Sequence, residues 1–447
     1  MSNFINHLCF LLLLSTTTTT TTKNVVVSAL TSPSDISALK AFKSAVNPSS
    51  IPSWSCLASW DFAAADPCAS PRRTHFTCAL TCSPDSTHIT QITLDPVGYS
   101  GSLTPLVSLL SQLTALDLAD NNFSGQIPSS ISSLLNLRTL TLRSNKFSGS
   151  LPSSITKLKF LDSLDISRNS LSGFLPKRID SMTGLRRLDL SFNKLAGSIP
   201  KLPPNLFELA MKGNSLSGSI SKSSFGELTQ LEVVELSENS LTGTLESWFF
   251  LLPSLQQVDL ANNSLTRIEI SSPPGSASDL VAVDLGFNRI GGYAPAKFAD
   301  YPLLSSLSLR YNRLRGKIPL EYGQKKSLRR LYLDGNFLIG QPPAGFFGGK
   351  SGVSGSLGDN CLWGCPVSSQ LCLPSQKPSG ICKQAYGGRG KPRGSVAGAE
   401  GTSLSTPRDH AWEGAPGAMT QRPEATAPGY HSRLSPPAVL STRGGEC

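Results

Sequence analysis

This 447-residue chain is short of several residue types that enzymes commonly need. Charged residues make up only 16% of it, against roughly 25% in an average soluble domain. No histidine occurs between His88 and His410, so the central segment offers no imidazole for general acid–base catalysis. No cysteine occurs between Cys82 and Cys361. These absences argue against an enzyme that depends on histidine or on several metal ions.

Long apolar runs are missing as well. The apolar run at residues 8–14 is too short to span a bilayer, which takes about 18 or more apolar residues, and no later segment reaches that length. Small residues at 27–29 suit cleavage after Ala29. We therefore expect residues 1–29 to be a signal peptide. The chain is expected to be secreted to the extracellular space or cell wall, with plasma-membrane association if its native C-terminus differs from this one.

The last segment, residues 384–447, differs in composition from the rest. It is rich in Gly, Pro, Ala, Arg, Ser and Thr and has no apolar period, which predicts disorder. Two interpretations stay open. The segment is either a flexible basic tail or non-native sequence, because the composition changes abruptly after Lys383.

An internal repeat dominates what is present. Residues 113–128 read Leu-x-x-Leu-x-Leu-x-x-Asn-x-Phe-x-Gly-x-Ile-Pro, and residues 137–152 repeat the pattern. Successive Asn residues are separated by 24, 24, 24, 21, 25, 24, 25, 24 and 24 positions, and a degenerate first copy begins at Ile89. The ten Asn positions are Asn121, Asn145, Asn169, Asn193, Asn214, Asn239, Asn263, Asn288, Asn312 and Asn336.

Each position of the repeat has a physical reason. The Leu-x-Leu pair alternates like a strand, so both Leu side chains point inward. The Asn side chain can bond neighbouring backbone groups where the chain leaves the strand, which predicts a ladder of Asn along a stack of repeats. Gly permits the tight turn that follows. One repeat cannot bury its apolar face alone, so the array must be stacked and its ends capped.

This motif resembles that of the plant extracellular leucine-rich-repeat family, which includes receptor-like proteins, receptor-kinase ectodomains and polygalacturonase-inhibiting proteins. The resemblance covers residues 34–382. It implies an α/β solenoid, a right-handed leucine-rich-repeat superhelix with a parallel sheet on the concave face and disulfide-bonded N- and C-terminal caps. We expect about 11 copies over 89–345, between an N-terminal cap at 30–88 and a C-terminal cap at 346–383.

Three copies depart from the pattern. The copy between Asn193 and Asn214 is short, the copy after Asn263 lacks Gly-x-Ile-Pro, and the copy after Asn288 continues with Gly-Gly-Tyr. The register of the sheet is therefore open at these copies.

The caps contain the cysteines. Apolar residues at helical spacing over 35–46 predict a helix with Ser34 or Asp35 as its N-cap. Paired Cys spacings also allow zinc half-sites, but the secretory route and the open ends of the stack favour disulfides. Four Cys allow three pairings in each cap, and the sequence does not choose between them. The eight residues are Cys56, Cys68, Cys78, Cys82, Cys361, Cys365, Cys372 and Cys382.

A column of carboxylates is the only arrangement that invites a catalytic interpretation. These residues occupy the outward slot between the two Leu, which is commonly Asp in the family that the chain resembles. We expect a solvated column instead of a catalytic pair. We predict no catalytic residue, no metal site and no cofactor. The column comprises Asp117, Asp165, Asp189, Glu235, Asp259 and Asp284.

The outward slots of the strands are the expected binding surface, because a rigid frame presents them. In the last copies they hold aromatic residues and Arg, which are enriched in binding hot spots. The candidate ligand-binding residues are Phe287, Arg310, Tyr311, Arg330, Tyr332 and Asp334, with Ser308 among them and Phe192 in an earlier copy. Residues 310–330 hold eight basic residues and Glu321 alone, which predicts a basic collar suited to acidic partners.

These observations predict non-catalytic recognition of a peptide, protein or cell-wall ligand. A receptor-like ectodomain in plant defence or developmental signalling, with a membrane receptor-kinase partner, is the first interpretation. An apoplastic inhibitor of a microbial cell-wall hydrolase is the alternative. Acidic polysaccharide is a further expected partner, whereas nucleic acid is not. Asn122 and Asn262 begin glycosylation sequons.

Overall fold

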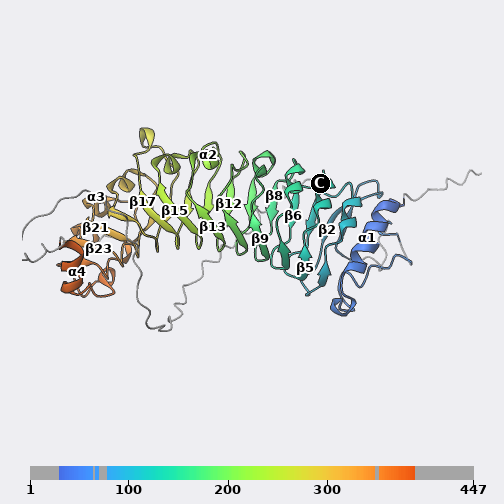
Figure 1. Ribbon diagram of the computed structural model, residues 1–447, viewed down its shortest axis with the longest axis horizontal. Helices are drawn as coiled ribbons and strands as arrows, with labels where there is room; N and C mark the ends of the chain where they lie inside the picture. Colours follow the sequence, from blue (N-terminus) through green and yellow to red (C-terminus); the bar gives the residue numbers. More distant parts are fainter. Residues whose placement is uncertain (1–29, 64–65, 70–77, 348–351, 388–447) are drawn as a thin grey trace, which may run out of the picture. The chain divides into compact units, whose positions relative to one another are not determined.

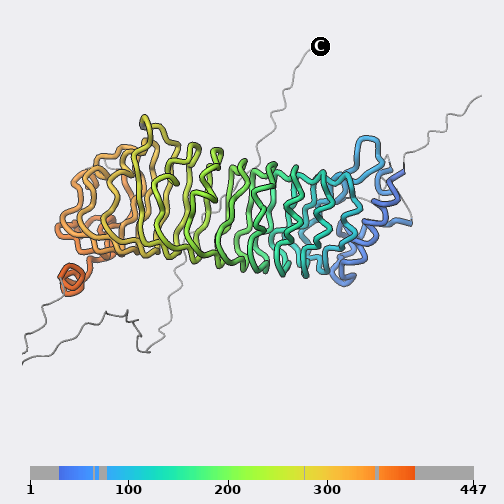
Figure 2. The backbone as a smooth tube through the Cα atoms, turned by 45° about the horizontal axis from the view of Figure 1, so that its top comes forward, coloured from blue at the N-terminus to red at the C-terminus, as the bar shows by residue number. Residues whose placement is uncertain are grey.

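The computed structural model describes residues 30–63, 66–69, 78–347 and 352–387, which belong to one compact unit (Figure 1). The expected signal peptide and nearly all of the expected tail lie outside these residues. Each repeat forms one coil, and Figure 2 shows the coils stacked on one another from the N-terminal to the C-terminal end. The leucine-rich-repeat solenoid that the repeat motif predicts is confirmed.

The first strand of each coil joins a long sheet, which has thirteen strands within the described residues. Its pairs are parallel except at the start, where β1 runs antiparallel to β2. Equivalent residues of successive copies stand side by side, so Leu116 is level with Leu140 and Leu164. The strands are β1 Leu80–Cys82, β2 Ile89–Thr93, β4 Ala115–Asp117, β6 Thr139–Thr141, β8 Ser163–Asp165, β10 Arg187–Asp189, β12 Glu208–Ala210, β14 Val233–Glu235, β16 Gln257–Asp259, β18 Ala282–Asp284, β20 Ser306–Ser308, β22 Arg330–Tyr332 and β24 Ser354–Ser356.

The second strand of each coil joins one of two further parallel sheets. The second sheet comprises β3 Ser100–Ser102, β5 Asn122–Gln126, β7 Lys146–Gly149, β9 Ser170–Phe174, β11 Lys194–Gly197, β13 Ser215–Gly218, β15 Ser240–Leu245 and β17 Ser264–Ile268. The third sheet comprises β19 Gly291–Tyr293, β21 Arg313–Lys317, β23 Phe337–Gly340 and β25 Cys361–Leu362. The break between the two sheets follows β17, in the copy that lacks Gly-x-Ile-Pro.

Helices close the ends and connect the coils. In Figure 1, α1 lies at one end of the stack and α4 at the other. The α-helices are α1 Pro33–Ala45, α2 Lys222–Phe225, α3 Leu320–Gln324 and α4 Ser379–Tyr386. The 3-10 helices are η1 Pro48–Ser50, η2 Pro105–Leu109, η3 Ser129–Ser133, η4 Ser153–Lys157, η5 Ile179–Ser181, η6 Ser247–Leu251, η7 Pro274–Ser276, η8 Ala296–Asp300, η9 Ala344–Phe346 and η10 Gln370–Cys372. None of the helices in the described ranges is long and apolar enough to cross a membrane.

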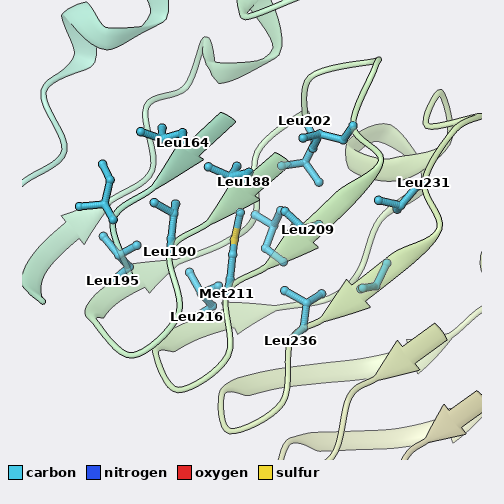
Figure 3. Close-up of a cluster of buried hydrophobic side chains, with 14 of the residues drawn as sticks. Leu164, Leu188, Leu190, Leu195, Leu202, Leu209, Met211, Leu216, Leu231 and Leu236 are labelled. Carbon is cyan, nitrogen blue, oxygen red and sulfur yellow. The ribbon is translucent and has the colours of Figure 1, made fainter. Parts of the chain in front are cut away.

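The core is a column of Leu side chains between the sheets. Figure 3 shows Leu188 and Leu209 from the long sheet and Leu195 and Leu216 from the second sheet, with Leu190 and Met211 between them. All six are at most 1% exposed. Because each coil buries its Leu residues against the next coil, stability comes from stacking and not from any single repeat.

The predicted Asn ladder is present. The Asn145 side-chain oxygen accepts a hydrogen bond from the Phe123 amide at 2.9 Å, and its nitrogen donates to the Leu118 carbonyl at 2.8 Å. Asn360 makes the same pair of bonds, to the Leu338 amide and the Leu333 carbonyl, although the sequence places it in the C-terminal cap. The ladder therefore has one rung more than the ten Asn of the sequence pattern.

The short copy leaves the register of the long sheet unchanged. Leu188, Leu209 and Val234 stand level in β10, β12 and β14. This copy is shorter than the others in the connection between β11 and β12, which contains no 3-10 helix. The deletion thus shortens a loop and leaves the sheet intact.

Four disulfides tie the caps, as predicted. They join Cys56 to Cys78, Cys68 to Cys82, Cys361 to Cys382 and Cys365 to Cys372. The sulfur atoms are therefore not available as zinc ligands.

Two boundaries need correction. The cap helix starts at Pro33 with Ser32 as its N-cap, because Pro is preorganised for the first helical position. Asp35 is instead fully buried and accepts a hydrogen bond from the Ile89 amide at 2.7 Å. At the other end, the expected tail begins at residue 384, but α4 continues to Tyr386. The Tyr386 hydroxyl holds it by bonding Gly316 and Phe337 of the third sheet.

Candidate ligand-binding face

The register of the long sheet brings the predicted binding residues into rows. Asp284, Ser308 and Tyr332 stand level on β18, β20 and β22. The next outward position of each copy holds Gly286, Arg310 and Asp334, at the point where the strand ends. The residue after that immediately precedes the ladder Asn. Side chains that are 24 or 25 positions apart in sequence thus form one continuous surface.

The position before the ladder Asn has a left-handed backbone. Phe287 has φ 55° and Tyr311 has φ 48°, whereas Gly213 and Gly335 occupy this position in two other copies. The left-handed conformation costs a non-glycine residue roughly 1–2 kcal/mol. Other non-glycine residues, such as Ser144 and Glu238, adopt the same conformation at this position of their copies, so the left-handed backbone is a property of the repeat.

Phe287 and Tyr311 form a shelf on this face. Their ring centroids are 4.7 Å apart and their planes differ by 12°. The residues remain 44% and 38% exposed. Gly335 makes room at the far side of the shelf, because a Cβ atom there would lie 2.5 Å from Cδ1 of Tyr311. The shelf is thus a pair of stacked, partly exposed rings on a rigid frame.

Arg310 lies among three aromatic rings. Its guanidinium carbon is 5.7 Å from the Phe287 ring centroid, 5.4 Å from that of Tyr311 and 5.2 Å from that of Tyr332. Its Nη2 atom is 2.9 Å from a carboxylate oxygen of Asp334, whose side chain is 1% exposed. The charge of Arg310 is therefore largely neutralised, and the rings are held in place around it.

Three polar atoms beneath the shelf have unused hydrogen-bonding capacity. They are Ser308 Oγ, Arg310 Nε and Asp334 Oδ1, each buried without a hydrogen-bond partner among the described protein atoms. Buried polar groups are nearly always paired with protein or ordered water, so these three call for a partner. A bound ligand or water that reaches them would gain specific polar contacts.

The remaining predicted binding residues lie farther from the shelf. Arg330 begins β22 on the same face, level with Ser306. Phe192 occupies the left-handed position in its own copy, with φ 54°. The guanidinium of Arg168 lies 4.6 Å from its ring centroid.

The carboxylate column is less solvated than the sequence suggested. Burial raises the pKa of the Asp189, Glu235 and Asp259 carboxyls, and neighbouring carboxylates raise it further. The neighbours include Asp165 for Asp189 and Asp284 for Asp259. The expected solvated column is thus a half-buried one, because strands about 4.8 Å apart shield one another's side chains.

The two sequons lie at different places in their coils. Asn122 begins β5, and its side-chain amide donates to the Gly98 carbonyl at 3.3 Å. Asn262 lies between β16 and β17, where it is exposed and left-handed, and its backbone amide donates to the Gly286 carbonyl at 3.0 Å. A glycan on Asn262 would therefore border the shelf. Glycosylation at both positions stays a prediction.

The basic collar is distributed around the coil. Arg310 and Arg330 lie on the long sheet, whereas the β21 residues Arg313, Arg315 and Lys317 lie on the third sheet. Lys325 donates to the Ala299 carbonyl at 3.1 Å, and burial lowers the pKa of its ammonium group. The collar thus contains separate groups with different surroundings.

Comparisons with known proteins agree with this architecture. The family model described as "Leucine-rich repeat region" matches residues 94–339, which is more than half of the chain. Receptor-like protein 7 of Arabidopsis thaliana is 36% identical over 73 residues, which are 16% of this chain and 8% of that protein. Receptor like protein 27 of the same organism is 37% identical over 79 residues, or 18% of this chain and 10% of that protein.

Solved structures give the same result. PEPR1 in the PEPR1-AtPEP1 crystal structure is 31% identical with a TM-score of 0.66, over 74% of this chain and 45% of that one. The plant peptide hormone receptor RGFR1, in complex with RGF2, is 30% identical with a TM-score of 0.53, over 59% of this chain and 46% of that one. The chain spans about a tenth or less of these curated relatives and under half of these receptors. The chain belongs to the leucine-rich repeat family, and its fold is that of plant leucine-rich-repeat receptor ectodomains.

Proposed function

We propose that this chain is the extracellular recognition domain of a receptor-like protein. In this proposal it binds a peptide or a protein segment without catalysis, on the solvent face of the long sheet from Phe287 to Asp334. A membrane receptor kinase would be the signalling partner. The similarity to PEPR1 and RGFR1 supports this proposal. The structure of each of these receptors is named together with a second molecule, AtPEP1 for PEPR1 and RGF2 for RGFR1.

The observation that carries the proposal is the shelf itself. Phe287 and Tyr311 are partly exposed, and their rings stack on each other with centroids 4.7 Å apart. Neither ring is needed to fill the core. Stacked, preorganised aromatic side chains with polar groups beneath them are suited to anchoring a ligand side chain.

The same backbone gives a clean test. Replacing both residues with glycine, Phe287→Gly with Tyr311→Gly, removes the shelf and relieves the left-handed strain. Peptides selected from a random-sequence display library on the wild-type chain should bind this double variant at least about tenfold more weakly, whereas its thermal unfolding temperature should not fall.

The matched control is Glu238→Gly, which makes the same change to glycine at the same left-handed position of an earlier copy. It should leave peptide affinity unchanged. Equal affinity of the wild type and the double-glycine variant would exclude the shelf as the binding site.

A further inference from the structure

We propose that the third sheet is a second binding surface, which takes a linear acidic polysaccharide built of uronic acid units. This surface, called here the third-sheet face, comprises Arg289, Tyr293, Arg313, Arg315 and Lys317. It goes beyond the proposed peptide recognition, because it lies on strands that are not part of the long sheet.

The charge on this face is unbalanced. The four cationic residues are exposed, and no Asp or Glu occurs in β19, β21, β23 or β25. Among the described residues, no ion pair joins any of these four cations to a carboxylate. Arg310 is different, because buried Asp334 neutralises it. The four cations of the third-sheet face therefore have no carboxylate partner among the described residues, in contrast to Arg310 of the collar.

An aromatic platform lies within these charges. Tyr293 is 78% exposed, yet its ring covers Gly316 of the next strand. A Cβ atom on Gly316, which has φ +78°, would lie 2.5 Å from Cδ1 of Tyr293. The sheet register places Tyr293 level with Arg315. The ring is therefore packed on backbone on one side, while most of the side chain stays open to solvent.

The platform is held rigidly from the C-terminal side. The Tyr386 hydroxyl accepts a hydrogen bond from the Gly316 amide at 2.8 Å and donates one to the Phe337 carbonyl at 2.6 Å. The guanidinium carbon of Arg315 lies 5.9 Å from the Tyr386 ring centroid. The disulfide from Cys361 to Cys382 joins the helix that carries Tyr386 to β25. Such preorganisation reduces the entropy lost on binding.

Uronic acid polymers match both features of this face. The apolar face of a sugar ring can lie on an open aromatic ring, and an Arg fork suits a carboxylate geometrically. Arg313, Arg315 and Lys317 occupy alternate positions of β21, about 6.6 Å apart along the strand, which presents a row of cations to a polymer with one carboxylate on each ring.

Polygalacturonate is the probe that tests this proposal, and its fully methyl-esterified form is the matched ligand control. At about 0.1 M salt, where the Debye length is about 10 Å, the wild type should bind polygalacturonate at least about tenfold more tightly than the ester. The double variant Arg313→Gln with Arg315→Gln should lose about tenfold in affinity, and Tyr293→Ala about three- to tenfold.

The chain offers a matched protein control. Lys146 and Lys194 follow a ladder Asn as Arg313 does, but they lie in the second sheet. The double variant Lys146→Gln with Lys194→Gln should keep wild-type affinity for polygalacturonate. A selected peptide should bind the Arg313/Arg315 variant normally, so the two faces can fail independently.

Several results would overturn the proposal. Equal binding of polygalacturonate and its methyl ester would do so, as would unchanged affinity in the Arg313/Arg315 variant. Equal losses in the Lys146/Lys194 control would show that net charge alone attracts the polymer. Anionic phosphatidylserine vesicles that bind while polygalacturonate does not would assign the face to a membrane.

Discussion

At the scale of single residues, the fold depends on an Asn side chain that is hydrogen-bonded in each copy and buried in most of them. Asn145 is 8% exposed, and it joins its own coil to the preceding one through both ends of its amide. The sequence predicted these Asn from their spacing alone, because the repeat makes each position recur. It did not predict that Asp334 is buried under Arg310, since burial of that carboxylate depends on neighbouring copies.

The first prediction concerns the ladder. Asn145→Ala would leave the buried Phe123 amide without a partner and would remove the 2.8 Å hydrogen bond to the Leu118 carbonyl, so we expect a loss of about 2–4 kcal/mol in unfolding free energy. Denaturant unfolding measures it. Asn136→Ala removes an exposed Asn that bonds the Ser111 carbonyl, and it should change stability by less than about 0.5 kcal/mol. Similar losses in both variants would contradict a special role for the ladder.

The second prediction concerns the carboxylate column. Burial and then the charge of Asp259 raise the pKa of the Glu235 carboxyl in the folded state. The folded chain therefore binds a proton more readily than the unfolded chain, and stability from this group is lost as pH rises above the ordinary Glu range near about 4. Glu235→Gln should gain about 0.5–1 kcal/mol at pH 7 and nothing at low pH.

Unfolding across a pH series measures this gain. The control is Glu269→Gln, which changes an exposed carboxylate outside the column. A gain for Glu235→Gln that does not change with pH would show that charge in the column is not its cause.

At the scale of elements, the sequence predicts the short strands inside the array of repeats. It does not predict the strand and the helix that end the array on the C-terminal side. The Leu-x-Leu alternation located the strands of the long sheet, and helical spacing located α1. The strand β24 was missed, because Gly355 stands level with Leu331 where other copies have Leu. The helix α4 was missed as well, because it has no buried residue and depends on contacts of Tyr386 with strands far away in sequence.

The third prediction follows for α4. Cys361→Ser with Cys382→Ser removes the disulfide that ties this helix to β25. Because α4 buries no side chain, its backbone amides should then exchange with solvent at least about tenfold faster, while those of β14 stay protected. Hydrogen exchange followed by mass spectrometry measures both segments. Unchanged protection of α4 would show that Tyr386 alone holds the helix.

At the scale of the whole molecule, the solenoid places residues that are one repeat apart in sequence next to each other on one surface. The spacing of 24 or 25 residues brings Phe287 level with Tyr311 and brings Asp284 level with Ser308, so ligand-binding residues can be inferred once the register is known. The stacked geometry also separates the basic residues onto different sheets, which a count of charges cannot do. The Cys pairings likewise needed coordinates, because sequence leaves three choices in each cap.

The central claim is that the shelf binds the ligand. The most direct test is a crystal structure of the chain with a peptide selected on the wild type. The account predicts that the peptide lies over Phe287 and Tyr311 and that the ion pair between Arg310 and Asp334 remains beneath it. A peptide bound to the second or third sheet, with both rings still open to solvent, would contradict the account.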